Sequence, residues 1–171
     1  VLLALGEALR ITGDWERAEA LMREAIDISD DDLLRARAQT ALGDLLSFRE
    51  GYREAIDVLD TALTTFNAND DEAGAAVALK HMSFAHLRLG DYAAARVVGE
   101  QQLSAAGATH DRVAISDARL NLGMVDWFTG QMDTALTVFE TVREESREAG
   151  YVQGIIYAGS NVGGIHYGRG D

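Results

Sequence analysis

Four histidines are the side chains best suited to acid–base or metal chemistry in this chain, which contains no cysteine. They are His81, His86, His110 and His166. No pair of them shows the His-Glu-x-x-His spacing that places two metal ligands on one helix face. The lack of cysteine excludes disulfides, thiolate nucleophiles and cysteine-rich zinc sites. We therefore expect His86 and His166 to be hydrogen-bonded core residues, and we predict no bound metal.

The other motifs that suggest chemistry are incomplete. The glycines of residues 163–170 lack the spacing and the Lys-Ser/Thr ending of a phosphate-binding loop. The acidic run at 67–72 lacks the turn glycine and the distal glutamate of a calcium-binding loop. The tripeptide Arg169-Gly170-Asp171 resembles an adhesion motif, but its last two residues match a turn that recurs along the chain. The sequence thus predicts no cofactor and a protein that is not an enzyme.

Charge and composition argue against two classes of partner, nucleic acids and membranes. The 171 residues include 28 acidic and 15 basic side chains, and the formal charge of −13 would repel the phosphates of a nucleic acid. No apolar run approaches the roughly 18 residues that a membrane span requires. No segment has the pattern of a secretion signal. We expect a cytoplasmic protein that binds neither nucleic acid nor membrane.

A turn pattern recurs along the whole chain, and it defines the elements that would position any functional residue. Its copies begin at residues 13, 50, 90, 130 and 170, a spacing of 37 and then 40 residues. Such a period is typical of stacked helical hairpins, and the absence of proline leaves long helices unbroken. We predict nine helices, over residues 1–11, 14–28, 32–49, 52–66, 71–89, 92–106, 111–129, 132–148 and 152–168.

Side chains that cap helices support several of these bounds. Asp14 and Asp91 precede second helices of hairpins and can accept a hydrogen bond from the first helical turn. Asn69 followed by Glu72 resembles a capping box for the fifth helix.

The repeated residues resemble those of the tetratricopeptide repeat (TPR) family. Each copy has a small residue in the first helix and an alanine five residues after the turn begins, as in Ala95. The family's Gly-Asp-aromatic turn is complete in Gly13-Asp14-Trp15 and Gly90-Asp91-Tyr92, and the copies at Glu50 and Gly130 match it in part. The resemblance implies an all-α solenoid, a right-handed superhelix of about 4.5 helical hairpins. The 40-residue period resembles the longer repeats of MalT-like bacterial regulators and of kinesin light chains.

We interpret residues 1–171 as one solenoid, and as a piece of a longer array. The expected repeats are approximately 1–30, 31–68, 69–108, 109–150 and a partial 151–171. The last helix would expose apolar residues such as Ile155 and Val162 that a following helix should bury. End-to-end self-association of this form is therefore a second expectation.

The resemblance implies that the first helix of each hairpin lines a concave wall. These helices carry seven basic and four acidic side chains, counted over residues 1–11, 33–49, 73–89, 113–129 and 152–168, although the chain as a whole is acidic. The family's groove-facing positions fall on Arg37, Thr40, Ala41, Asp44, Lys80, His81, Phe84, Arg88, Asp117, Asn121, Met124, Trp127, Phe128, Tyr157, Asn161 and Tyr167. Asn121 and Asn161, one period apart, resemble an asparagine ladder that holds a bound chain. The alternative is that asparagine bridges adjacent repeats and that the aromatic residues pack on neighbouring hairpins.

The resulting hypothesis is a non-catalytic scaffold that binds a peptide or protein segment in its concave groove, with Phe84, Trp127 and Tyr157 as aromatic anchors. The alternative hypothesis is the effector-sensing arm of a bacterial transcriptional regulator or signalling ATPase. An enzyme is the third possibility, and it would need convergent titratable groups that the sequence does not show.

Overall fold

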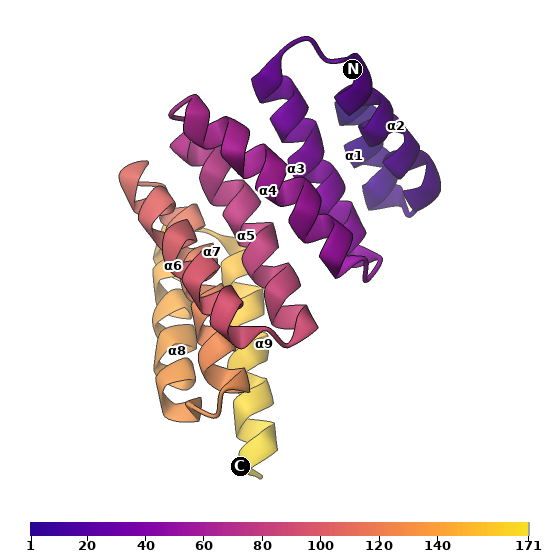
Figure 1. Ribbon diagram of the computed structural model, residues 1–171. Coiled ribbons are helices and arrows are strands. Elements are labelled where there is room, and N and C mark those ends of the chain that lie inside the picture. Colours follow the sequence, from indigo (N-terminus) through magenta and orange to yellow (C-terminus); the bar gives the residue numbers. More distant parts are fainter. Residues whose placement is uncertain (171) are drawn as a thin grey trace.

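The computed structural model describes residues 1–170, and within that range it contains helices and no strand (Figure 1). The expected all-α fold is therefore confirmed, and every predicted helix is found with its ends within two residues of the prediction. The helices are α1 (Leu2–Thr12), α2 (Trp15–Ile28), α3 (Asp32–Phe48), α4 (Tyr52–Ala68), α5 (Glu72–Leu89), α6 (Tyr92–Ala108), α7 (Arg112–Phe128), α8 (Met132–Ala149) and α9 (Val152–Arg169).

The helices form two layers. Each helix packs against the next one in the chain, and α1, α3, α5, α7 and α9 also contact one another in that order. The even-numbered helices α2, α4, α6 and α8 make no such contacts with each other. The odd helices therefore share one inner layer, as expected for a solenoid of hairpins. In Figure 1 the turns inside the hairpins follow one edge, and the loops between hairpins follow the opposite edge.

Left-handed backbone conformations recur at equivalent turn positions. Inside the hairpins, Gly13, Gly90 and Gly130 have positive φ, and Glu50 takes this place in the second hairpin with φ of 65°. Glycine adopts this conformation without steric cost, whereas Glu50 must accept some strain. The fifth copy of the turn begins at Gly170, and its Asp171 lies outside the described residues.

Aspartates cap most of the inner helices. The carboxylates of Asp31, Asp71 and Asp111 each accept a backbone hydrogen bond from the first turn of α3, α5 and α7. The predicted cap Asp91 is confirmed, because it accepts from the Ala94 N–H. The carboxylate of Asp14 makes no such bond, although the residue occupies the capping position of α2.

The predicted capping box at Asn69 is wrong. Asn69 ends α4, and its side-chain amide donates to the Thr65 carbonyl at 2.8 Å. Asp71 caps α5 instead, since its carboxylate accepts from the Gly74 N–H at 2.9 Å. Asp70 between them has a φ of 53°, so the chain reverses direction after Asn69 and before the helix begins.

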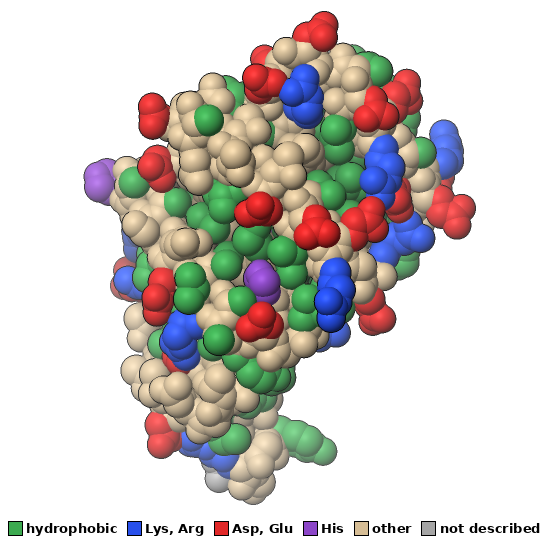
Figure 2. Space-filling model, viewed as in Figure 1, with side chains coloured by type: hydrophobic (Ala, Val, Ile, Leu, Met, Phe, Trp, Pro, Cys, Tyr) green, Lys and Arg blue, Asp and Glu red, His purple; other side chains and the backbone are tan. Residues whose placement is uncertain are grey.

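The core is built from small residues and a few large ones between the two layers. Gly43 and Gly123 allow the second helix of each hairpin to come close: a Cβ at Gly43 would lie 2.5 Å from Leu59 Cγ, and one at Gly123 would lie 2.8 Å from Phe139 Cε1. These two glycines therefore permit the close packing of the two helices within their hairpins. Figure 2 shows acidic side chains spread over the face that α2, α4 and α6 form, with basic and apolar side chains between them.

Candidate functional site

A hollow of about 620 Å³ lies on the inner layer where α1, α3 and α5 meet. Its lining combines an apolar floor with charged walls. The apolar part includes Leu3, Ala41 and Val77, and Val77 is 47% exposed although it is an aliphatic residue in a helix. The charged residues of the lining are Glu7, Arg10, Arg37, Asp44, Asp71 and Lys80, together with His81. A concave surface of this kind can hold a small group or one side chain of a larger partner.

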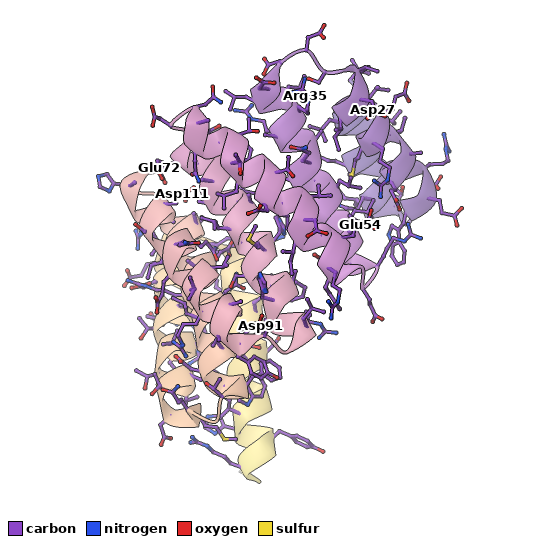
Figure 3. All side chains as sticks on the ribbon, viewed as in Figure 1. Asp27, Arg35, Glu54, Glu72, Asp91 and Asp111 are labelled. Carbon is purple, nitrogen blue, oxygen red and sulfur yellow. The ribbon has the colours of Figure 1, made fainter. Side chains whose placement is uncertain are left out.

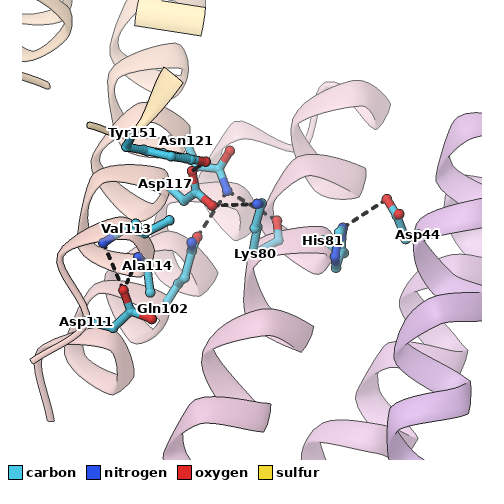
Figure 4. Close-up of polar contacts among 10 residues, drawn as sticks. All are labelled: Asp44, Lys80, His81, Gln102, Asp111, Val113, Ala114, Asp117, Asn121 and Tyr151. Carbon is cyan, nitrogen blue, oxygen red and sulfur yellow. Dashed lines mark hydrogen bonds and ion pairs between the residues drawn. The ribbon is translucent and has the colours of Figure 1, made fainter. Parts of the chain in front are cut away.

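Asp44 is the centre of the charge cluster at one end of the hollow. Its carboxylate lies 3.1 Å from His81 Nδ1 (Figure 4) and 3.4 Å from the Arg10 guanidinium. Burial by itself would raise the pKa of Asp44, but the hydrogen bond from His81 and the charges of His81, Arg10 and Lys80 outweigh it, so that the pKa is lowered from 3.8. Asp44 therefore stays ionised and keeps negative charge in the hollow at neutral pH.

Arg37 lies at the other end of the hollow and is loosely paired. Its guanidinium is 3.7 Å from the Asp71 carboxylate, a separation too long for a hydrogen bond, and 63% of its side chain is exposed. Because Asp71 also caps α5, its orientation is fixed by the helix rather than by the arginine. The guanidinium N–H groups of Arg37 can therefore still donate hydrogen bonds into the hollow.

Lys80 is engaged by the neighbouring inner helix. Its ammonium group lies 2.5 Å from Asp117 Oδ2, and the Tyr151 hydroxyl donates to Asp117 Oδ1 at 2.7 Å. Asp117 is only 8% exposed, so these two donors compensate a largely buried carboxylate (Figure 4). Burial, and next the hydrogen bond to Asp117, raises the pKa of Tyr151 well above 10. The three residues connect α5, α7 and the start of α9.

Asn121 bridges helices, which is the alternative that the sequence left open. Its amide group donates to Gln102 Oε1 at 3.0 Å and to the Lys80 carbonyl at 3.2 Å. Gln102 lies on α6 and is 1% exposed. The amide of Asn121 is therefore directed at α5 and α6, where it satisfies a buried acceptor.

The aromatic candidates of α7 form a chain of rings. Trp127 is half-buried, lies 5.9 Å from Phe128 between ring centroids, and meets Phe139 edge-on at 6.4 Å. Phe128 is 53% exposed and stacks on Tyr92 at 5.8 Å. Phe128 thus lies at the edge of the turns, whereas the ring of Trp127 is directed into the packing of α7 against α8.

The remaining predicted residues are distributed over the inner helices. Phe84, Met124 and Asn161 are half-buried, whereas Tyr157 and Tyr167 on α9 are 57% and 88% exposed. Arg88 lies at the turn edge, where its Nε donates to the Tyr52 hydroxyl at 3.1 Å. Of the sixteen predicted positions, the hollow brings together Arg37, Thr40, Ala41, Asp44, Lys80 and His81.

Several residues of the hollow were not predicted as site residues. They are Glu7, Arg10, Asp71 and Val77, with Leu3 on the floor. Val77 stands forty residues from both Arg37 and Asp117, so the repeat register itself was the signal that could have found it. Its apolar type was instead typical of a core position.

The residues that the structure describes contain neither a candidate metal site nor a membrane-spanning helix. There, no three residues among His, Cys, Asp and Glu converge in a way that could hold a metal ion. Across the same residues, no helix combines the length and the apolar character needed to traverse a lipid bilayer.

The sequence matches two family models, and both describe the tetratricopeptide repeat. One covers residues 1–68 and the other residues 116–141, which together make up more than half of the chain. The chain belongs to the tetratricopeptide repeat family, as its turns and periodicity predicted. No curated protein matches it in sequence.

Solved structures with the same fold cover nearly all of the chain. A Rap protein complexed with competence and sporulation factor superposes with a TM-score of 0.89 at 13% identity, over 99% of this chain and 48% of that one. A Rap conjugation gene regulator of plasmid pLS20, in complex with the Phr* peptide, gives 0.78 at 15%, over 97% and 47%. A putative kinesin light chain from Podosopora anserina gives 0.76 at 13%, over 99% and 85%. This chain thus spans about half the length of the Rap proteins.

These likenesses establish the fold. They confirm the expected solenoid and its similarity to kinesin-light-chain-type repeats. The resemblance to MalT-like regulators stays a prediction.

Proposed function

We propose that the chain is a non-catalytic scaffold that binds a peptide or protein segment along its inner layer. The observation that carries this proposal is the hollow of about 620 Å³ between α1, α3 and α5, which combines an exposed apolar floor with charged residues at both ends. Such a combination suits a polypeptide, because a side chain can be buried while the adjacent backbone and charges remain paired.

The arrangement of the hollow indicates how a segment would be held. An apolar side chain of the ligand would cover Val77, Ala41 and Leu3, which the structure leaves open to solvent on one side. Arg37, with its long contact to Asp71, can donate to a backbone carbonyl or to a carboxylate of the ligand. The cluster around Asp44 offers an acceptor at the other end.

The inner layer continues beyond the hollow toward α9. Tyr157 is 57% exposed, more than the other two predicted anchors Phe84 and Trp127, and we propose it as the second anchor. Trp127 and Phe84 are half-buried, so they would support the surface from below rather than insert into the ligand. Two buried anchors are compatible with a micromolar complex, about −8 kcal/mol.

The fold likeness supports this proposal. Two Rap structures are titled as complexes, one with competence and sporulation factor and one with the Phr* peptide. This chain aligns with about half of each. The same arrangement of hairpins is thus compatible with a bound peptide.

Selection from a phage-displayed library of random 12-residue peptides tests the proposal. We expect recovered peptides to share an apolar residue next to a charged one, and synthetic copies to bind with micromolar Kd in calorimetry. Recovered peptides that bind equally well after substitution of residues in the hollow would contradict it.

The second candidate is an effector-sensing arm of a bacterial transcriptional regulator or signalling ATPase. The observation that favours it is the likeness to a Rap protein titled as a conjugation gene regulator. In that case, the neighbouring coding sequence would contain a DNA-binding helix-turn-helix or a phosphate-binding loop. Flanks made only of further repeats would favour the plain scaffold.

A further inference from the structure

One face of α9 is left uncovered by the other helices (Figure 1). Among the described elements, α9 contacts α8 and α7 only. The uncovered face carries Val152, Ile156, Gly163 and Tyr167, whose spacing of four, seven and four residues places them along one side of the helix. The three side chains are 62%, 56% and 88% exposed, in that order. We call these four residues the α9 stripe.

Gly163 marks this face as the equivalent of an interface that is closed in other hairpins. It stands forty residues after Gly123, where a Cβ would meet Phe139 of the neighbouring outer helix. Gly43 lies against Leu59 in the same way. A Cβ at Gly163, in contrast, would meet nothing within 4 Å. The α9 stripe therefore continues a series of helix–helix interfaces and can receive a large apolar side chain over its glycine.

The α9 stripe is also more apolar than the repeat requires. Val152 occupies a position that is charged and exposed in the preceding inner helices, where the residues are Asp32, Glu72 and Arg112. Ile156 occupies a position that is small and buried in the same helices, where the residues are Ala36, Ala76 and Ser116. A large side chain in this place fits a partner surface that has an opening opposite it.

The α9 stripe is complementary to itself. In a contact with two-fold symmetry, each copy offers the same residues to the other. If two α9 helices pack antiparallel with the axis between residues 159 and 160, Ile156 lies opposite Gly163 of the second copy. In the same register, Val152 lies opposite Tyr167 of the second copy. Each isoleucine then enters the open space over a glycine, and symmetry makes this contact twice.

The distribution of charge favours the same contact. Each of α1–α8 contains at least one acidic residue, and Asp27, Glu54 and Glu72 are labelled examples in Figure 3. Helix α9 contains none, and the guanidinium of Arg169 lies 2.6 Å from the Asp133 carboxylate. Two copies of a chain with a formal charge of −13 repel each other. Contact through α9 brings them together where no carboxylate lies on the facing helices.

We propose that α9 binds α9 of a second copy of this chain in an antiparallel dimer with two-fold symmetry, in which Ile156 of each copy packs against Gly163 of the other. A single helix pair buries less than the roughly 1,200 Å² of a stable interface, so this dimer is weak and depends on concentration. The α9 stripe contains neither Tyr157 nor any residue that lines the hollow. The inference is therefore independent of the proposed function.

Sedimentation equilibrium of the chain tests the proposal. We expect a monomer–dimer equilibrium with a Kd of about 100 μM. Ile156→Glu places a carboxylate in both symmetric contacts and should weaken the dimer at least tenfold. Val97→Glu is the matched control, because Val97 on α6 is also 56% exposed and lies outside the α9 stripe. We expect this control to leave the Kd unchanged within about twofold.

A pair of charged variants tests the register. Gly163→Lys fills the space that receives Ile156, so Gly163→Lys and Ile156→Glu should each be monomeric when alone. In an equal mixture, one contact joins the introduced carboxylate to the introduced ammonium group, and the other contact keeps the native isoleucine and glycine. We expect the mixture to form dimers. Circular dichroism checks that every variant remains folded.

Four outcomes would overturn the proposal. The first is a chain that stays monomeric at about 1 mM, which would leave the α9 stripe to a helix of another protein. The second is a dimer that Ile156→Glu weakens no more than Val97→Glu does. The third is a mixture of the two charged variants that stays monomeric. The fourth is a mass that grows beyond the dimer, since a head-to-tail contact with a different surface does not close.

Discussion

Trp127 of α7 lies directly against the backbone of α9 at Gly164. A Cβ built on Gly164 would come within 2.6 Å of Trp127 Cη2, so the whole indole ring, which packs on Phe128 and Phe139, would have to shift. We predict that Gly164→Ala destabilises the chain by about 1–3 kcal/mol. The measurement is the midpoint of urea unfolding followed by circular dichroism.

Gly163 provides a matched control on the same helix. A Cβ at this position would meet nothing within 4 Å, so Gly163→Ala should stabilise the helix by about 0.5–1 kcal/mol through its lower unfolded-state entropy. If both substitutions shift the urea midpoint in the same direction, the contact with Trp127 does not determine how Gly164→Ala affects stability.

The hydrogen bond between Asn121 and Gln102 predicts a strong energetic coupling. Asn121→Ala would leave the buried Gln102 carbonyl oxygen without this donor, at a cost of about 1–3 kcal/mol. In the double variant Asn121→Leu and Gln102→Leu, no buried polar group is left unpaired, and Val142 shows that the position equivalent to Gln102 accepts an aliphatic residue. We expect that double variant to be more stable than Asn121→Ala. Additive losses in a double-mutant cycle would contradict the bridge.

The lowered pKa of Asp44 predicts that part of the free energy of unfolding depends on pH. Because its pKa is lowered from 3.8 in the folded chain, the unfolded state binds more protons near pH 4. The stabilisation is therefore present above that pH and is lost as pH falls through the folded pKa. The difference in unfolding free energy between wild type and Asp44→Asn should shrink between pH 6 and pH 3.

Asp57 serves as the control for this prediction. It is exposed on α4, and Asp57→Asn should leave the pH dependence of the wild type unchanged. A difference between wild type and Asp44→Asn that stays constant across the pH range would show that the contacts with His81 and Arg10 do not depend on the ionised carboxylate.

Glu50 occupies a turn position that glycine fills in three other hairpins. With φ of 65°, a Cβ-bearing residue is strained there, so we predict that Glu50→Gly raises the unfolding free energy by about 1 kcal/mol. Glu50→Ala keeps the Cβ and should give no such gain. Thermal unfolding of the two variants separates relief of strain from a loss of charge, because both remove the carboxylate.

Much of the fold could be predicted from the residues at the turns and from their spacing. The glycine or aspartate at each turn, the aromatic residue or methionine after it and the 40-residue spacing defined every helix to within two residues. The fifth helix shows where this fails: Asn69 and Asp71 are both good caps, and only the backbone path after Asn69 decides between them. Helix-capping propensity alone does not distinguish Asn69 from Asp71.

The candidate site was less predictable, because it depends on how helices are rotated against their neighbours. Asn121 had the right type for a ligand contact, but its partner Gln102 lies on α6, and no spacing rule joins the two. Val77 had the type of a core residue, and only the position of α5 between α3 and α7 leaves it exposed in the hollow.

The central claim, that the hollow on the inner layer binds a polypeptide segment, is tested most directly by one pair of variants. Val77→Asp places a charge on the exposed apolar floor, and Val97→Asp makes the same change on α6, outside the hollow, at a residue that is 56% exposed. Calorimetric titration of a library-selected peptide should show at least a tenfold weaker Kd for Val77→Asp, about 1.4 kcal/mol, and an unchanged Kd for Val97→Asp. An equal Kd for Val77→Asp and the wild type would contradict the claim.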